Sequence, residues 1–406
     1  MQARRWHRWV GSALGLLLLY LGLTGSVVQG IDLHALLTHA PETDPEMMAI
    51  RESMDGPGNY AVIAASDYTA AALPPASDPA AMAQRVFAAA HASAPGNAIR
   101  WVDLRMQGGK AVGQAGMGED ALWRFDPASG RRLPDPPVMR EKGPPFSWHL
   151  YAKRWHRLWS LGDGMLWLNA LAGLGLGFAV IAGLLLWWQL YRARWRMGRR
   201  APAWKGGGAA RVAHRALGPV MAVPLLVVAV SGTILSIDSL ALQIYRLRYP
   251  DRLAFGVVPQ GMIADQSRPL TAGEVSTIAR TTLTLHQAES GGAPIRALRI
   301  RIFAGMPQGV IITGEPLARQ LVYDTAQGRR AGMSEPTYPD TVFPTGWDWH
   351  ERLKRIHRGD EFGMIGRWLG LMAGLSLMWF AGSGLWMYRE LYLRRRKGGR
   401  QALFWR

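Results

Sequence analysis

The 406-residue sequence contains no cysteine. This absence excludes disulfide bonds, iron–sulfur clusters held by thiolates, and covalent haem attachment through a C-x-x-C-H motif. Any haem would therefore be held by axial side-chain ligands and non-covalent contacts. No flavin-binding or nicotinamide-binding motif is visible either, so an electron donor would be a separate component.

Acidic residues are scarce as well, with 29 Asp and Glu against 47 Lys and Arg and a formal net charge of +18. The basic residues gather in three segments beside long apolar runs: Arg4 to Arg8, Arg192 to Arg215, and Arg394 to Arg406. Such segments stay on the cytoplasmic side of a membrane protein. The charge therefore indicates membrane topology, and we expect no nucleic-acid partner.

Charges are almost absent from four apolar runs: Val10 to Ile31, Met165 to Leu190, Leu217 to Ile237, and Ile365 to Tyr388. A helix needs about 20 such residues to cross a bilayer core, so the runs predict four transmembrane helices. The first run has the alternative of a cleaved signal peptide. It is long and lacks a convincing cleavage site, which favours a retained anchor.

The two long segments between paired runs each contain a helix-like stretch, alternating strand-like residues and a turn of the form FDPASG (125–130) or YDTAQG (323–328). These signals predict two small α+β modules on the outer side of the membrane. The expected organisation, in chain order, is: transmembrane helix 1 (1–32), module 1 (33–147), a juxtamembrane helix with transmembrane helix 2 (148–196), a cytoplasmic loop (197–213), transmembrane helix 3 (214–238), module 2 (239–348), a juxtamembrane helix with transmembrane helix 4 (349–394), and a cytoplasmic tail (395–406).

A decapeptide occurs twice, as WHLYAKRWHR (148–157) and WHERLKRIHR (349–358). The first and third apolar runs match too: each follows a His-Arg pair (His7, His214), and seventeen residues after the histidine comes a small-Gly pair (24–25, 231–232). These repeats predict a tandem duplication of two parallel halves, 1–205 and 206–406, related by a pseudo-twofold axis along the membrane normal. Such an axis would place His7 opposite His214, and His156 opposite His357.

Histidines repeated in register at membrane boundaries are functional candidates, and a b-type haem needs two imidazoles from different helices in an apolar cleft. A single boundary histidine is more often an interfacial residue, but the register favours ligands. The first histidines of the decapeptides, His149 and His350, remain alternative ligands, substrate contacts or propionate partners. His91 and His286 are expected on the surface. Nearby arginines suit either haem propionates or lipid head groups: Arg5, Arg154, Arg215 and Arg355.

The RWHRWVG and VAHRALG openings, the K-R-x-H-R segments and the FDPASG and YDTAQG turns resemble the PepSY-associated transmembrane family, and within it the inner-membrane siderophore-iron reductases of Gram-negative bacteria. The resemblance implies a mainly α membrane protein, with four transmembrane helices and two periplasmic PepSY-like modules, located in the inner membrane with both termini cytoplasmic. It also implies b-type haem, two groups here, with His7, His214, His156 and His357 as axial ligands.

The implied activity is that of an oxidoreductase that reduces ferric siderophore in the periplasm and releases ferrous iron. The electron donor would be quinol or a cytoplasmic reductase. Substrate candidates, where a bulky chelate could dock between modules and membrane, are Trp148, His149, Trp347, Trp349 and His350. Two alternatives stay open: a permease that moves a ferric chelate or metal without redox chemistry, and a membrane-tethered PepSY module that regulates a periplasmic partner.

Overall fold

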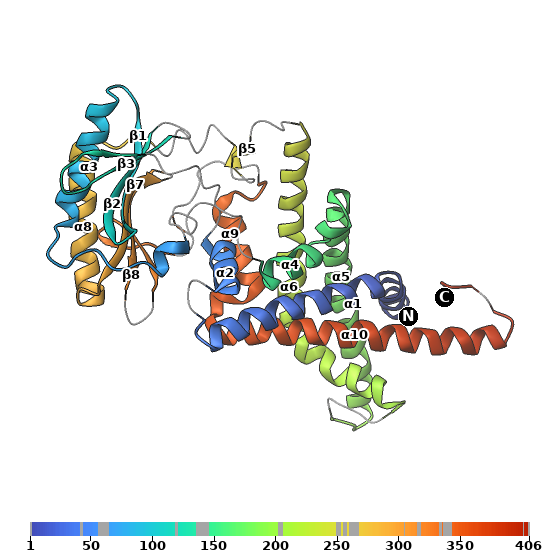
Figure 1. Ribbon diagram of the computed structural model, residues 1–406. Coiled ribbons are helices and arrows are strands. Elements are labelled where there is room, and N and C mark those ends of the chain that lie inside the picture. Colours follow the sequence, from blue (N-terminus) through green and yellow to red (C-terminus); the bar gives the residue numbers. More distant parts are fainter. Residues whose placement is uncertain are drawn as a thin grey trace.

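The computed structural model describes residues 2–40, 44–55, 65–117, 121–134, 146–201, 206–248, 253–254, 258–259, 268–303, 305–314, 318–332, 335, 343–400 and 402–404. It contains a bundle of long helices at one end and a helix-covered sheet at the other (Figure 1). Three short helices lie between them: α2 (Pro45–Asp55), α4 (Trp148–His156) and α9 (Trp347–Arg358).

The four predicted transmembrane helices are confirmed as helices. They are α1 (Gln2–Leu37), α5 (Leu166–Arg196), α6 (Ala209–Arg248) and α10 (Gly363–Lys397). Only 17% to 28% of their most apolar stretches is buried within the protein, so most of this apolar surface is left for lipid. A bilayer requires such helices because their backbone groups are satisfied internally.

Within the bundle, α1 packs along α10 and α5 along α6, while α1 also contacts α5 and α6 contacts α10. Small residues allow the close approach. A Cβ atom on Gly374 would lie 2.5 Å from Ser26 Oγ, and one on Gly173 would lie 2.2 Å from Thr233 Oγ1. Small side chains at helix crossings are typical of membrane bundles because lipid gives helices no hydrophobic reason to associate.

The two predicted modules share one antiparallel sheet of eight strands, ordered β10-β9-β8-β7-β1-β2-β3-β4. Its strands are β1 (Ile99–Gln107), β2 (Lys110–Met117), β3 (Ala121–Phe125), β4 (Arg132–Leu133), β7 (Ile295–Phe303), β8 (Met306–Thr313), β9 (Gln320–Asp324) and β10 (Arg329–Arg330). A separate pair consists of β5 (Leu253–Ala254) and β6 (Val258–Pro259), and single turns of 3-10 helix form η1 (Ala65–Tyr68), η2 (Trp159–Leu161), η3 (Asp163–Met165) and η5 (Asp360–Phe362).

The halves join through β1 and β7, where Asp103 lies opposite Arg299 and the pairing continues evenly on both sides. Strand β1 would otherwise be an exposed edge open to aggregation, and pairing with β7 removes that edge. Arg299 donates to both carboxylate oxygens of Asp103, and Arg105 binds the same carboxylate at 2.7 Å. Sequence alone predicted two modules and did not predict this join.

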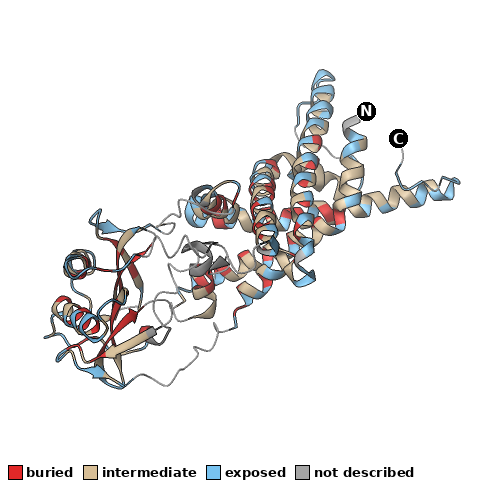
Figure 2. Ribbon diagram, turned by 90° about the horizontal axis from the view of Figure 1, so that it is seen from above, coloured by how far each residue is buried: buried red, intermediate tan, exposed pale blue. Residues whose placement is uncertain are grey.

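Helices α3 (Pro79–Ser93) and α8 (Ala272–Ser290) pack against each other and cover one face of the sheet. Capping residues define where both helices begin. Asp78 caps α3, and Thr271 with Glu274 forms a capping box on α8. Figure 2 shows buried residues concentrated in this sheet and on the inner faces of the long helices. One hydrophobic core spans both halves, with Val86, Leu104, Ile278 and Ile300 among its members.

The prediction that His286 lies on the surface is wrong, since the residue is 2% exposed. Its Nε2 lies 2.8 Å from the carbonyl of Ala293, so it ties the end of α8 to the chain entering β7. His91, at the end of α3, is exposed as expected.

Gly309 on β8 generates a stability prediction. A Cβ there would lie 1.7 Å from Thr282 Oγ1 and 2.6 Å from Thr282 Cβ, on the facing side of α8. Gly309→Ala should therefore lower the free energy of unfolding by about 1–3 kcal/mol through overpacking. Thermal unfolding of the purified protein measures this. Gly273→Ala, in α8 with open space around it, is the matched control; equal melting temperatures for the two variants would contradict the packing described.

Candidate functional site: two histidine pairs

The structure brings the four predicted histidines together in two pairs. His7 on α1 and His214 on α6 have ring centres 6.3 Å apart, and His156 at the end of α4 and His357 on α9 have ring centres 6.4 Å apart. We call His7 and His214 the terminus-side pair, and His156 and His357 the module-side pair. Each pair joins one residue from each half of the chain.

The module-side rings are held through Nδ1 by hydroxyl groups. His156 Nδ1 lies 3.0 Å from Thr24 Oγ1, and His357 Nδ1 lies 3.0 Å from Ser231 Oγ. Each hydroxyl donates its own proton to a helix carbonyl, Thr24 to Tyr20 at 2.9 Å and Ser231 to Val227 at 2.6 Å. The hydroxyl oxygen must then accept from the ring, so Nδ1 carries the hydrogen and the lone pair of each neutral imidazole is on Nε2.

The terminus-side rings are held through the same nitrogen. His7 Nδ1 lies 2.8 Å from the carbonyl oxygen of Ala179, and His214 Nδ1 lies 2.9 Å from Ser383 Oγ. A carbonyl oxygen can only accept, so His7 also carries its hydrogen on Nδ1. Its Nε2 is again the nitrogen with the lone pair, which is the form of imidazole that binds a metal.

Three of the four histidines lie against a two-residue step of a small residue followed by glycine: Thr24-Gly25, Ser231-Gly232 and Ala182-Gly183. His214 contacts the hydroxyl of Ser383, and a Cβ on the following Gly384 would have no atom within 4 Å. A Cβ on Gly25 or Gly183 would lie 3.1 Å from Cε1 of His156 or His7, and one on Gly232 would lie 2.9 Å from Cε1 of His357. The glycines therefore make room for the rings. Sequence reasoning noticed the first two steps without assigning them a role. It missed the step on α5, although the same small-Gly pattern marks it, and it missed Ser383 on α10.

Burial keeps the module-side rings neutral. It lowers the pKa of both His156 and His357 to about 4, and the nearby charges of Arg157 and Arg358 act in the same direction. Both rings are therefore uncharged near neutral pH. A metal ligand must be the neutral imidazole, so the surroundings favour the ligand form.

The spacing of the rings fits one metal between each pair. A ligating nitrogen lies about 2.0 to 2.1 Å from a first-row metal and the ring centre roughly 1.15 Å behind it, so two rings on opposite sides of one ion have centres about 6.3 to 6.5 Å apart. Both pairs fall in this range. Among the described residues, no group of three or more His, Asp and Glu side chains is arranged to hold a metal. Two neutral imidazoles per site are the residues that would hold a haem iron.

His149 and His350, the first histidines of the decapeptides, make a different contact. His149 Nδ1 lies 2.5 Å from Asp32 on α1, and His350 Nδ1 lies 2.9 Å from Asp238 on α6. All four side chains are buried. These bonds tie α4 and α9 to the long helices, about two helical turns from the module-side pair.

Further polar contacts fix the same two short helices. Glu46 accepts from the backbone N–H groups of Trp148 and His149 at 2.7 and 2.8 Å and so caps the start of α4. Asp32 also binds Arg367 at 2.5 Å, and Arg367, 2% exposed, binds Asp360 in turn. Arg367 lies ten residues after His357, and the equivalent position in the first half, ten residues after His156, is Leu166. The ion pair with an arginine is therefore made by Asp32 and has no counterpart at Asp238.

The predicted arginines lie around the two ends of the bundle. Arg5 lies over the ring of Trp9 at 5.0 Å, and Arg215 donates to the carbonyl of Gly206. Arg355 binds Glu361 at 3.1 Å, and Arg154 is exposed.

The predicted substrate residues lie on the short helices between sheet and bundle (Figure 1). Trp148 is 60% exposed and packs edge-on against Phe146 and Tyr151, and Trp349 on α9 is 56% exposed. The side chain of Trp347 lies outside the described residues. His149 and His350, in contrast, are buried beside their aspartates.

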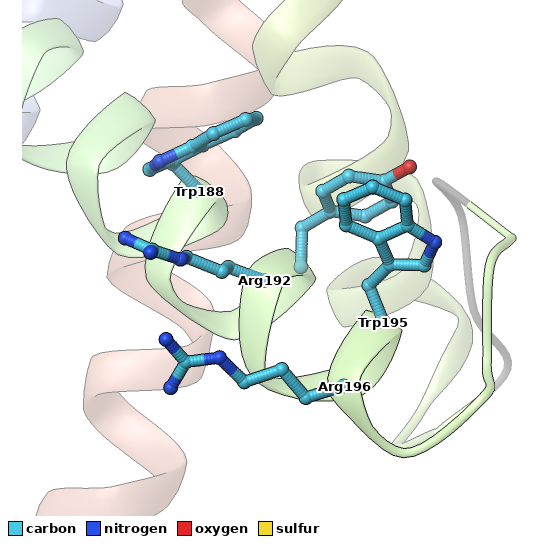
Figure 3. A pocket seen from close by; sticks show the side chains of 5 residues that line it. Trp188, Arg192, Trp195 and Arg196 are labelled. Carbon is cyan, nitrogen blue, oxygen red and sulfur yellow. The ribbon is translucent and has the colours of Figure 1, made fainter.

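The opposite end of the bundle is aromatic and basic. A surface hollow of about 270 Å³ at the end of α5 is lined by Trp188, Tyr191, Arg192, Trp195 and Arg196 (Figure 3). The end of α10 carries a similar group, Arg394, Arg396 and Lys397. Tryptophan and arginine at helix ends are typical of the membrane–water boundary.

Comparison with known families agrees with this architecture. The family model for the PepSY-associated TM region matches residues 4–390. The chain belongs to this family. No curated protein matches the sequence at a significant level. Family membership and four long apolar helices together identify a multi-pass membrane protein.

The two His–Asp contacts predict that removing Asp32 lowers the stability of the protein more than removing Asp238 does. Asp238→Ala removes the carboxylate that binds His350 and Thr345 and should cost about 1–3 kcal/mol of stability. Asp32→Ala removes the acceptor of His149 and, in addition, one of the two carboxylates that bind the buried Arg367, so its loss should exceed that of Asp238→Ala by about 1.5–3 kcal/mol. Thermal unfolding in detergent compares the two, with Glu390→Gln on the partly exposed part of α10 as control. Equal losses from both aspartate variants would count against the one-sided ion pair.

Proposed function

We propose that this protein is a haem-containing reductase of the bacterial inner membrane, which passes electrons across the membrane to ferric siderophore and releases ferrous iron. The observation that carries the proposal is the separation of the ring centres, 6.3 and 6.4 Å, in two pairs of imidazoles that all bind protein through Nδ1. Haem bound there would supply reversible one-electron transfer at iron. His7 with His214, and His156 with His357, would be its axial ligands.

The placement of the pairs supports transfer across a bilayer. Along α1, His7 and the His156-contacting Gly25 are eighteen residues apart, as are His214 and the His357-contacting Gly232 along α6. At 1.5 Å per residue this is about 27 Å, close to the roughly 30 Å of a hydrocarbon core. One pair would therefore lie near each face of the membrane.

Charge distribution supports the orientation. Along α5 and α10 the basic helix ends lie beyond the residues that contact the terminus-side pair, and along α1 the N-terminal arginines flank His7. Both termini are therefore proposed to be cytoplasmic and the sheet periplasmic. The matched contacts of the halves and the even pairing of β1 with β7 about Asp103 and Arg299 support origin by tandem duplication. A pseudo-twofold axis then explains why each pair takes one histidine from each half.

The module-side pair lies next to the short helices that carry Trp148 and Trp349, so a ferric siderophore is proposed to dock there, between sheet and membrane. The substrate iron gains one electron, Fe(III) becoming Fe(II), and the donor, quinol or a cytoplasmic reductase, loses it. Hard oxygen ligands hold Fe(II) less tightly than Fe(III), which frees the metal.

Visible spectroscopy of the purified protein tests the proposal. We expect a Soret band and reducible α and β bands with two haems per chain. His156→Ala with His357→Ala should remove one haem, and His7→Ala with His214→Ala the other, because each loses both axial ligands. His91→Ala, on the exposed end of α3, is the matched control and should keep both.

A colourless protein that still supports iron uptake would overturn the proposal in favour of a permease. A colourless protein without effect on iron uptake would point to regulation of a periplasmic partner instead.

A further inference from the structure

Two hydroxyl groups contact Nδ1 of the module-side histidines, at equivalent positions in the two halves. Thr24 on α1 and Ser231 on α6 each follow a terminus-side histidine by seventeen residues and each contact a module-side histidine at 3.0 Å. Ser231 is 2% exposed, so water does not compete for its contact. Helices α1 and α6 thus each supply a candidate ligand to the terminus-side pair and a hydrogen-bond acceptor to the module-side pair.

Each hydroxyl is fixed as an acceptor toward the ring. Its proton is donated to the carbonyl four residues earlier, Tyr20 or Val227, so only its oxygen lone pair faces Nδ1–H.

A hydrogen bond at Nδ1 changes how strongly Nε2 donates to a metal. As the acceptor pulls on the Nδ1 hydrogen, the ring becomes a stronger donor, and a stronger donor stabilises Fe(III) over Fe(II) and lowers the reduction potential. The terminus-side His7 lacks such a hydroxyl, because Ala182 occupies the place taken by Thr24, Ser231 and Ser383 in the other steps, and it binds the Ala179 carbonyl instead.

We propose that Thr24 and Ser231 are positioning residues which hold the Nδ1–H form of His156 and His357 and set the reduction potential of the module-side haem. This inference rests on the proposed function. The hydroxyls touch no substrate and act through the two histidines.

Redox titration of the purified full-length protein, followed in the α band, tests the inference. Thr24→Val keeps the side-chain volume and Ser231→Ala removes little, so the double variant loses both hydroxyl acceptors without a large change in packing. We expect two haems per chain as before, an upward shift in the midpoint potential of the module-side haem, and no change in the other. The His7→Ala, His214→Ala background assigns the shifted potential, because it leaves only the module-side haem.

Two matched variants separate this role from simple packing. Thr24→Ser retains the hydroxyl and should retain the wild-type potential. Ser26→Ala removes a buried hydroxyl two residues along α1 that donates to the Gly22 carbonyl, and it should leave both potentials unchanged.

The possible outcomes are distinct from those of the proposed function. Two haems with unchanged potentials in the double variant would overturn the role of Thr24 and Ser231 and leave the reductase intact. An equal shift from Ser26→Ala would likewise reject it, since that hydroxyl contacts Gly22 rather than a histidine. A wild-type protein without haem would instead overturn the proposed function.

Discussion

The hydrogen bonds between Asp32 and His149 and between Asp238 and His350 are the contacts on which the module-side pair depends. They hold α4 and α9, short helices outside the long apolar runs, against α1 and α6. Because His156 and His357 lie seven residues beyond His149 and His350, about two helical turns, anchoring the first histidine of each decapeptide positions the second. The repeated decapeptide thus combines an anchoring histidine with a candidate ligand.

The long helices in turn receive these histidines at small-Gly steps. Gly25 and Gly232 leave room for the rings, and Thr24 and Ser231 bind them through Nδ1. On α5 the step Ala182-Gly183 receives His7 in the same way, while on α10 the hydroxyl of Ser383 binds His214. A glycine preceded by a small residue therefore makes room for three of the four candidate ligands, and the polar partner of each of the four rings is either a side-chain hydroxyl or a main-chain carbonyl.

The shared sheet reinforces this arrangement. By pairing β1 with β7, the chain joins its two halves outside the bundle, and α3 packs on α8 over a common core. The Asp103–Arg299 contact at the centre of the join couples one residue of each half, as do the histidine pairs. Covering the strand edges also leaves the central strands buried instead of open to other chains.

Several features could be predicted from the sequence because they depend on local pattern. Runs of about 20 uncharged residues demand transmembrane helices, the capping residues Asp78 and Thr271 start α3 and α8, and the repeated histidines indicate pairing across the halves. The family followed from motif order. Other features depend on contacts between residues far apart in the chain: the single sheet, the burial of His286, the aspartates that bind His149 and His350, and the small-Gly steps of α5 and α10. The sequence identifies the candidate histidines but does not show which ring nitrogen of each one forms a hydrogen bond to the protein. Only the tertiary structure decides that, because the acceptors of Nδ1 come from other helices.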